Sequence, residues 1–321
     1  MTLPATRQRI PALDALRGAA LVGMFAFHLT WDLGFFRLIP EDFPYSAGVM
    51  GFGHVVAITF LALAGASLVL ATRDGVDWRA FGRRLAMIAG AAAAITLGTL
   101  YLFPDAFIFF GILHCIAVSS LLALAFLRAP PWLALAAAAL MAAAPMLVAS
   151  PALDNLFGWS LGLSAHPPRT NDWRPLMPWG GAVLAGLGLM RLALARGLPD
   201  WLTGWRADAG WSRALAWGGR HSLLVYLTHQ PVFLAVVWLA ATAIGPREAP
   251  PLPEELQFQE SCVSACATAS ANAPACTALC GCVADGARAA GLWRPMMDNR
   301  LTPVQRQTID GLTRTCAPQR Q

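Results

Sequence analysis

The stretch "WGGRHSLLVYLTHQPVFLAVVWL", residues 217–239, decides the fold class of this protein. It is an apolar run of about the length, roughly 20 residues, that a helix needs to cross a bilayer. Five residues interrupt the run: His221, Tyr226, His229, Gln230 and Pro231. Because an unpaired polar group is costly in hydrocarbon, each polar side chain here must have a partner or a purpose. The stretch therefore predicts a membrane helix with one polar side.

The composition of the whole chain points the same way. Its 321 residues are 57% hydrophobic and only 13% charged, with a mean hydropathy of +0.54, which is far from the balance of a soluble domain. All 23 basic residues are arginine, and the net charge of +5 does not require nucleic acid as a partner. We expect a polytopic membrane protein whose partner is the lipid bilayer, with no nucleic-acid partner.

Seven apolar stretches approach the length of a membrane span. They lie at residues 15–36, 50–71, 85–103, 107–127, 131–149, 176–195 and 220–244. The first stretch carries charged residues and no small-residue cleavage pattern, so we expect a retained helix rather than a signal peptide. The predicted fold is all-α, with about seven transmembrane helices in a domain of residues 1–245 and a small disulfide-rich helical tail over residues 246–321.

The arginines are distributed unevenly between the two sides of this predicted bundle. With the N-terminus in the cytoplasm, thirteen of the sixteen arginines before residue 246 fall on or near the inner side, and only Arg37, Arg169 and Arg174 fall in outer loops. This bias is typical of the positive-inside rule. We therefore expect a multi-pass protein of the bacterial inner membrane, with a cytoplasmic N-terminus and a periplasmic tail.

The tail contains six of the seven cysteines: Cys262, Cys266, Cys276, Cys280, Cys282 and Cys316. An even number in an oxidising compartment favours a disulfide framework. The spacing of four residues puts each of the first two pairs on one face of a helix. We expect a two-helix hairpin stapled through facing cysteines, with Cys282 bonded to Cys316, although six cysteines allow many pairings. A zinc site is the alternative, but the C-x3-C spacing argues against it, and we expect no metal.

Several ionisable residues fall inside the predicted membrane segments. His28 lies about 16 Å along the first helix from Arg17, and Asp32 follows one turn later on the same face, where the two can pair. Three more histidines fall at compatible depths: His54, His114 and His229. A single intramembrane histidine is often a helix-packing partner, whereas four at such depths favour a shared polar cavity.

Five ordered blocks of the chain resemble a known family. They are "RIPALDALRGAALVGMFAFH" at 9–28, "ITFLALAGASLVLA" at 58–71, "FGILHCIAVS" at 110–119, "DWRPLMPWGG" at 172–181 and "HSLLVYLTHQP" at 221–231. Together they resemble the heparan-α-glucosaminide N-acetyltransferase catalytic-domain family, and the opening L-D-x-L-R-G is similar to the start of the integral membrane O-acyltransferases. The resemblance implies a membrane enzyme that takes an acyl group from cytoplasmic acetyl-CoA and gives it to an acceptor, commonly a sugar, on the other side.

The resemblance also implies roles for single residues. Arg17 falls on the arginine of the first block, His28 on a histidine found there in many bacterial members, and His229 on the histidine of the last block. Three positions fall in the D-x-x-P-L-x-P-W block: Asp172, Trp173 and Trp179. The lysosomal enzyme carries a catalytic histidine in the loop before the second helix, and that loop has none here.

The expected activity is therefore an acetyl-CoA-dependent acyltransferase with a sugar or envelope glycan as acceptor. A neutral histidine suits removal of the acceptor's proton, so we expect His28 to be the base or a transient acyl carrier, with Asp32 and His229 as the other catalytic residues. Three arginines are expected to hold the phosphates of acetyl-CoA: Arg17, Arg83 and Arg84. The acceptor side is expected to consist of His54, His114, Asp172, Trp173 and Trp179.

Two other classes of function fit parts of the sequence. Histidines and aspartates inside a membrane also relay protons in transporters, which predicts internal repeats, and the chain has no convincing repeat. The cysteine-rich tail also fits a membrane-anchored envelope assembly protein. Solute flux without acetyl-CoA consumption favours the transporter, whereas acetyl-CoA binding that survives deletion of residues 250–321 favours the enzyme.

Overall fold

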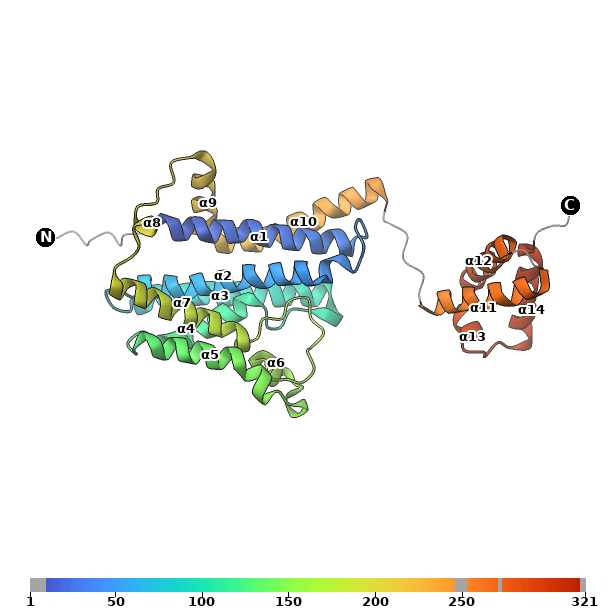
Figure 1. The fold of residues 1–321 in the computed structure, drawn as a ribbon, viewed down its shortest axis with the longest axis horizontal. Coiled ribbons are helices and arrows are strands. Elements are labelled where there is room, and N and C mark those ends of the chain that lie inside the picture. The colour runs from blue at the N-terminus through green and yellow to red at the C-terminus, as the bar shows by residue number, and fades with distance from the viewer. Residues whose placement is uncertain (1–9, 246–252, 271–272, 318–321) are drawn as a thin grey trace. The chain divides into compact units, whose positions relative to one another are not determined.

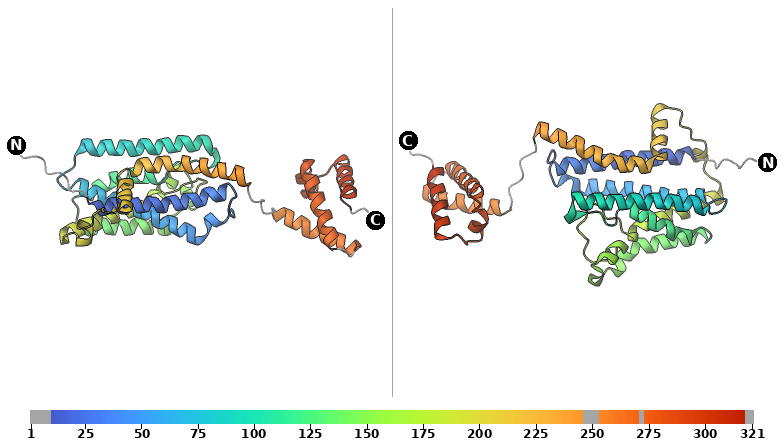
Figure 2. Two further views of the ribbon diagram at one scale, coloured as in Figure 1. Left: turned by 90° about the horizontal axis from the view of Figure 1, so that it is seen from above. Right: turned by 180° about the vertical axis from the view of Figure 1, so that it is seen from behind.

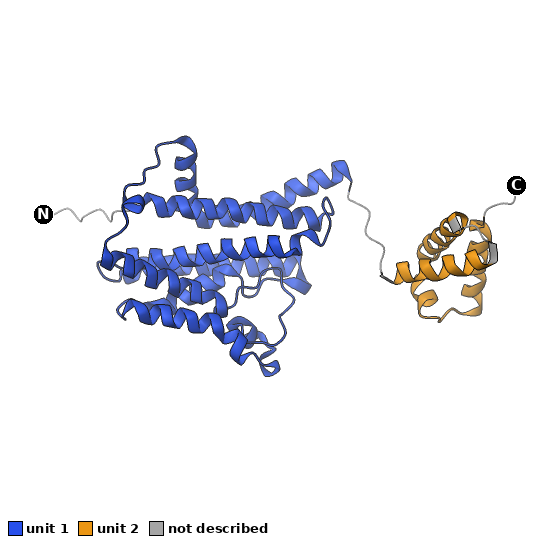
Figure 3. Ribbon diagram, in the orientation of Figure 1, with its two compact units in different colours: residues 1–247 blue, residues 248–321 orange. Residues whose placement is uncertain are grey.

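The structure is a computed structural model that describes residues 10–245, 253–270 and 273–317. The chain forms two compact units, residues 1–247 and 248–321 (Figure 3). The predicted junction at residue 246 lies outside the described residues. Regular structure within the described ranges is helical, and a single isolated β-bridge joins Ser150 to Ser164. The predicted all-α class is confirmed.

Six helices of the first unit, within the described residues, are long and apolar enough to cross a membrane (Figure 1). They are α1 (Pro11–Phe35), α2 (Ala47–Ala71), α3 (Trp78–Leu102), α5 (Pro131–Val148), α7 (Leu176–Arg196) and α10 (Ser222–Ile244). Large apolar side chains such as Leu97, Leu140 and Met146 are exposed on these helices, as expected for surfaces that face lipid rather than water. The chain is a multi-pass membrane protein.

The fourth predicted span differs from the prediction. Instead of a helix over 107–127, the structure has a short turn η2 (Pro104–Ala106), a non-helical segment, and then α4 (Ile112–Leu124). At 13 residues, α4 measures about 20 Å, which is short for a membrane-spanning helix, so a crossing at this place needs the non-helical segment as well. The loop at 170–174 takes up the backbone of the non-helical segment, because Arg174 N donates to Phe110 O and Thr170 Oγ1 donates to Phe107 O. Hydropathy alone did not distinguish this segment from a helix.

The core of the first unit is built by close approach of helix backbones. A Cβ added at Gly65 of α2 would lie 1.9 Å from the carbonyl oxygen of Val183 in α7, and one added at Gly186 would lie 2.0 Å from that of Ala62. Small residues allow such contacts, which supply the van der Waals packing that associates helices in lipid. Seen from above, α3 lies along one edge of the unit (Figure 2, left), in keeping with its largely exposed surface.

Shorter elements connect the membrane helices. They are η1 (Phe43–Tyr45), η3 (Pro151–Leu153), α6 (Leu156–Leu161), α8 (Asp200–Thr203) and α9 (Gly210–Arg220). Helix α9 packs against the beginning of α1, where a Cβ at Gly18 would lie 2.0 Å from the carbonyl oxygen of Leu215. Helix α10 packs against the same α1. This shared contact brings α10, from late in the sequence, beside the first helix of the chain.

The second unit contains α11 (Pro253–Ser270), α12 (Ala273–Ala289), α13 (Trp293–Met297) and α14 (Pro303–Cys316). Its disulfides join Cys262 to Cys280, Cys266 to Cys276 and Cys282 to Cys316. The predicted disulfide framework and helical hairpin are confirmed, and the zinc alternative is wrong because all six thiols are oxidised. The seventh cysteine, Cys115 of α4, is free and fully buried.

Candidate active site

Two histidines that are far apart in the sequence, one on the first membrane helix and one on the last, meet between α1 and α10. The ring centroids of His28 and His229 are 5.0 Å apart, with the rings inclined by 63°. His229 is only 7% exposed, and Phe25 stacks on it at 5.5 Å while Phe233 meets its ring edge-on at 5.8 Å. The two imidazoles therefore face each other inside an apolar wall, which excludes bulk water from the contact.

The hydrogen bond of His229 defines which ring nitrogen carries the proton. Its Nδ1 lies 2.6 Å from the carbonyl oxygen of Tyr226. A carbonyl oxygen only accepts, so Nδ1 is the donor, and Nε2 of the neutral ring carries the lone pair. This Nε2 is buried and has no hydrogen-bond partner among the described residues. His229 is held with a free, water-shielded lone pair, which is the arrangement that a general base requires.

The carboxylate of Asp32 lies on the same side of α1 and is fully buried. Its Oδ1 accepts a hydrogen bond of 2.7 Å from Nε2 of Gln230 on α10. The amide on the facing helix therefore binds the carboxylate, and no hydrogen bond of the described chain joins Asp32 to His28, so the predicted pair stays a prediction. Asp32 Oδ2 and Gln230 Oε1 are both buried without a partner in the described chain.

We call the contact of these four residues, His28, Asp32, His229 and Gln230, the histidine seam. It contains three buried polar atoms without partners, although buried polar groups are nearly always hydrogen-bonded in folded proteins. Leaving one unpaired costs about 1–3 kcal/mol. Such a concentration of unsatisfied atoms indicates that a ligand or an ordered water completes the seam.

A cavity of about 450 Å³ lies beside the first turns of α10. Its lining includes Arg17, Arg84, Arg220 and His221 together with Tyr226, which lies about one helical turn before His229. The predicted cofactor arginines Arg17 and Arg84 thus share one cavity, whereas Arg83 is not among its lining residues. The size is within the range of small-molecule sites in proteins.

The two predicted arginines of this cavity differ in how they are held. Arg17 donates to Asp14 Oδ1 at 2.9 Å, to Ser67 Oγ at 2.7 Å and to the carbonyl oxygen of Gly219 at 3.1 Å, so that it ties α1 to α2 and α9. No carboxylate of the described chain pairs with Arg84, and the positive charge of Arg17 acts on it. Two guanidinium groups at one cavity wall favour an anionic ligand.

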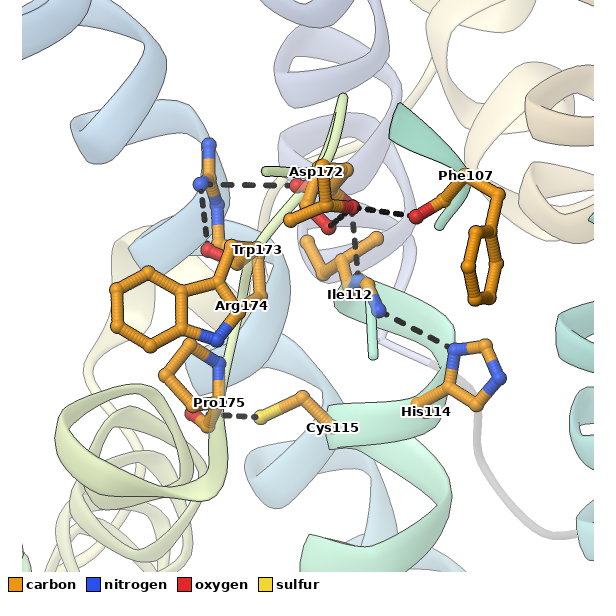
Figure 4. Close-up of polar contacts among 10 residues, drawn as sticks. Phe107, Ile112, His114, Cys115, Asp172, Trp173, Arg174 and Pro175 are labelled. Carbon is orange, nitrogen blue, oxygen red and sulfur yellow. Dashed lines mark hydrogen bonds and ion pairs between the residues drawn. The ribbon is translucent and has the colours of Figure 1, made fainter. Parts of the chain in front are cut away.

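A second polar cluster lies at the start of α4 (Figure 4). Asp172 Oδ2 accepts a hydrogen bond of 3.0 Å from Ile112 N, and Oδ1 lies 3.6 Å from Nη1 of Arg174. The carboxylate thereby caps the first turn of α4, where a negative charge is favourable to the helix dipole. Both oxygens of Asp172 are occupied by the scaffold.

His114 belongs to the same cluster, and both of its ring nitrogens are used. Gly111 N donates to Nδ1 at 3.2 Å, and Nε2 lies 3.3 Å from Oγ1 of Thr96. The Thr96 hydroxyl donates its own proton to Ile108 O at 2.7 Å, so Nε2 must be the donor to Thr96. His114 has no free lone pair in this state, and its observed contacts are those of a structural residue.

Of the remaining residues predicted for the acceptor side, Trp179 lies on α7 and His54 packs against its ring. His54 of α2 meets Trp179 edge-on at 5.3 Å, and the guanidinium of Arg174 lies 4.6 Å from the centre of the same ring. Trp173 donates through Nε1 to Trp159 O at 2.9 Å, which ties the indole to α6. Within the described chain no group of three or more His, Cys, Asp and Glu side chains is arranged to hold a metal ion.

Arg174 is a residue that the sequence analysis missed, since it counted only as an outer-loop arginine. Its guanidinium lies 4.6 Å from the centre of the Trp179 ring, against which His54 also packs, and it is mostly buried. The signal was present in the "DWRPLMPW" block, where a cation lies between two tryptophans.

Comparison with known proteins identifies the first unit. The family described as heparan-alpha-glucosaminide N-acetyltransferase, catalytic, matches residues 9–231 of the chain. No curated protein and no solved structure matches. The matched range contains both histidines of the seam and the arginines of the cavity, and the resemblance seen in the sequence is confirmed.

Proposed function

Because the chain belongs to the heparan-alpha-glucosaminide N-acetyltransferase catalytic family, whose activity is acetyl transfer, we propose that it acetylates an extracytoplasmic sugar or envelope glycan with cytoplasmic acetyl-CoA. The observation that carries this proposal is the His28–His229 contact with the buried, unpartnered Nε2 of His229. The setting is the bacterial inner membrane, with the N-terminus in the cytoplasm and the tail in the periplasm, as the arginine bias favours.

The proposed chemistry divides two tasks between the histidines. His28 attacks the thioester carbonyl carbon, a C–N bond forms and the C–S bond breaks, and the ring proton of His28 passes to His229 Nε2 and then to the departing thiolate. In the second step the acceptor's hydroxyl or amine attacks the acetyl carbon, a C–O or C–N bond to the acceptor forms and the C–N bond to His28 breaks. The acceptor's proton passes to His229 Nε2 and then to the released nitrogen of His28. Each proton transfer of this kind contributes about 10²–10⁴-fold to rate.

Positive charge near the reacting carbonyl supports these steps. Negative charge develops on the carbonyl oxygen during acyl transfer, and a preorganised cation in a water-poor site stabilises it strongly. Arg174, whose guanidinium lies over the Trp179 ring that His54 also contacts, is the residue proposed for this role. It is held by Asp172 and by the carbonyl oxygen of Trp173, so little reorganisation is needed.

The arginine cavity is proposed to receive the phosphates of acetyl-CoA. Arg17 is already oriented by three hydrogen bonds, and Arg84 and Arg220 offer forks for phosphate oxygens. The pantetheine arm would then extend past Tyr226 towards the seam. Arg84→Gln should raise the Kd for acetyl-CoA by about 10–100-fold, as expected for loss of a charge-assisted bond, whereas its neighbour Arg83→Gln is the matched control because Arg83 does not line the cavity.

The decisive experiment uses the purified full-length protein, labelled acetyl-CoA and an envelope extract. The wild type should transfer label to an acceptor, and His28→Ala should not, while still binding acetyl-CoA. Label retained on wild-type protein but absent from His28→Ala would support the acyl-histidine step. Transfer by His28→Ala at the wild-type rate would overturn the assignment of His28.

A further inference from the structure

Helix α9 has a buried side and an exposed side. The buried side packs on the first turns of α1 and consists of small residues, Ser212, Ala216 and Gly219. A Cβ added at Gly219 would lie 1.8 Å from the carbonyl oxygen of Asp14, so the two backbones are in direct contact. Helix α9 is therefore fixed to the membrane domain by its buried side, and its exposed side is free to contact what surrounds the domain.

The exposed side carries cationic and aromatic side chains at helical spacing. Arg213, Trp217 and Arg220 follow one another at intervals of four and three residues, which places them in one row along the helix. All three are exposed. The ring of His221 lies against that of Trp217, with the ring centroids 4.7 Å apart. We call Arg213, Trp217 and Arg220 the α9 row.

The positive charges of the α9 row are not neutralised by the protein. Arg213 donates to the backbone carbonyl oxygen of Asp208 at 3.0 Å. Neither arginine of the row forms an ion pair with a carboxylate of the described residues. Two unpaired guanidinium groups offer donors to a phosphate, and an indole between them has the preference of tryptophan for the membrane interface. The row is thus complementary in charge to an anionic phospholipid headgroup.

The place of α9 in the fold puts the row at the level of lipid headgroups. Helix α1 has 25 residues, and its length of about 37 Å exceeds the hydrocarbon thickness of about 30 Å. Its first turns therefore extend beyond the hydrocarbon, and α9 runs across the direction of α1 at these turns (Figure 1; Figure 2, right). A helix that crosses a membrane-spanning helix in this way lies along the membrane surface, where amphipathic helices with arginine and tryptophan bind anionic lipids.

We propose that the α9 row binds the headgroup of an anionic phospholipid in the leaflet on the side of the α1 N-terminus. The two guanidinium groups hold the phosphate, and the indole of Trp217 lies at the boundary between headgroups and acyl chains. Arg220 also lines the arginine cavity, whereas Arg213 and Trp217 do not. Substitutions at these two positions therefore test the lipid site without changing the proposed acetyl-CoA site.

The test measures lipid binding directly. Native mass spectrometry of the full-length protein in detergent would follow the binding of dioleoylphosphatidylglycerol, with dioleoylphosphatidylcholine as the zwitterionic comparison. The wild type should bind the anionic lipid more tightly. Arg213→Gln should raise the Kd of the tightest-bound anionic lipid about fivefold, the effect expected of one basic residue beside an anionic headgroup, and Trp217→Leu should raise it as well.

Two control variants separate the α9 row from misfolding and from general surface charge. Arg213→Lys keeps the positive charge and should retain most of the affinity. Arg73→Gln removes an exposed arginine beside Asp74, just after α2, and should bind the anionic lipid like the wild type.

Four results would overturn the proposal. The first is equal binding of the two lipids by the wild type, and the second is wild-type affinity for the anionic lipid in both Arg213→Gln and Trp217→Leu. The third is a loss of affinity in Arg73→Gln as large as that in Arg213→Gln, which would show a general effect of surface charge. The fourth is displacement of the bound lipid by acetyl-CoA, which would assign the row to the arginine cavity instead.

Discussion

The start of α4 and the histidine seam contain the same kinds of side chain and treat them differently. His114 at the start of α4 has partners for both ring nitrogens, whereas His229 in the seam has a buried Nε2 without a partner. Asp172 uses both carboxylate oxygens, whereas Asp32 uses one. Since satisfied polar groups stabilise a fold and unsatisfied ones cost free energy, we propose that the first region serves as scaffold and the second as the reacting site.

The difference matters because both regions looked alike in the sequence. Each places a histidine and an aspartate in or beside an apolar segment, and each falls in a block shared with the family. Residue type and family position therefore do not distinguish a histidine with partners on both ring nitrogens from one with an unpartnered nitrogen. The hydrogen-bond partners of the ring nitrogens make this distinction, and they predict measurable effects of mutation in both regions.

The largest expected effect is that of His229→Ala on rate. Loss of the proposed base should lower kcat for acetyl transfer by about 10²–10⁴-fold with little change in the yield of folded protein. The control is His166→Ala, whose side chain is exposed in an outer loop and whose loss should leave kcat unchanged. A His229→Ala enzyme with kcat close to the wild type would place the base elsewhere.

Gln230→Leu tests the other half of the seam. It removes the hydrogen bond to Asp32 and leaves a buried carboxylate unpaired, which should cost about 3 kcal/mol or more of unfolding free energy. Thermal unfolding in detergent would measure this loss. Thr228→Ala is the matched control on the same helix, because its hydroxyl binds only the backbone of α10; equal melting temperatures of the two variants would contradict the role of Gln230.

Asp172→Ala should destabilise the scaffold without directly removing a reacting group. The variant loses the cap of α4 and the ion pair with Arg174, with an expected cost of about 1.5–3 kcal/mol for hydrogen bonds to a charged group. Asp105→Ala, at an exposed position of η2, is the comparison. If Asp172→Ala and Asp105→Ala have the same melting temperature, the carboxylate of Asp172 does not stabilise the fold by capping α4.

His114→Ala should have a smaller effect, again on stability. Two neutral hydrogen bonds are lost, which together contribute about 1–2 kcal/mol, and kcat per folded molecule should stay within a few-fold of the wild type. Stability and kcat would be measured on one preparation. A hundredfold loss of kcat with an unchanged melting temperature would show that His114 takes part in the reaction, and would contradict the proposed difference between His114 and His229.

The smallest expected effect concerns the pair formed by Asp154 and His166 in the loops on either side of α6. The ring and backbone N–H groups of His166 hydrogen-bond to Asp154 and lower the pKa of that carboxyl below its ordinary value. A lowered pKa in the folded state means stability that is present above the unfolded pKa, near 3.9, and lost as the pH falls through the folded pKa. The difference in melting temperature between wild type and Asp154→Asn should therefore be small at pH 6 and vanish in stronger acid; a difference that grows in acid would contradict this sign.

Much of the architecture was predictable because it rests on local properties. A run of about 20 apolar residues is long enough to span the bilayer whatever surrounds it, and i, i+4 cysteines share a helix face without tertiary help. These rules predicted the membrane helices and the stapled hairpin of the tail. They were wrong for the segment before α4, where the loop at 170–174 supplies hydrogen bonds that a helix would otherwise make.

The sequence by itself determined a helical membrane protein of this family, with His28 and His229 as residues of interest and arginines gathered at one side. Only the tertiary structure decided that Asp32 binds Gln230, 198 positions away, that both ring nitrogens of His114 have partners, and that Arg174 lies over Trp179. The physical reason is that hydropathy and helix period act between near neighbours in the chain. Hydrogen bonds and charges act between whatever side chains the packing of α1 against α10 and of α4 against its loop brings together.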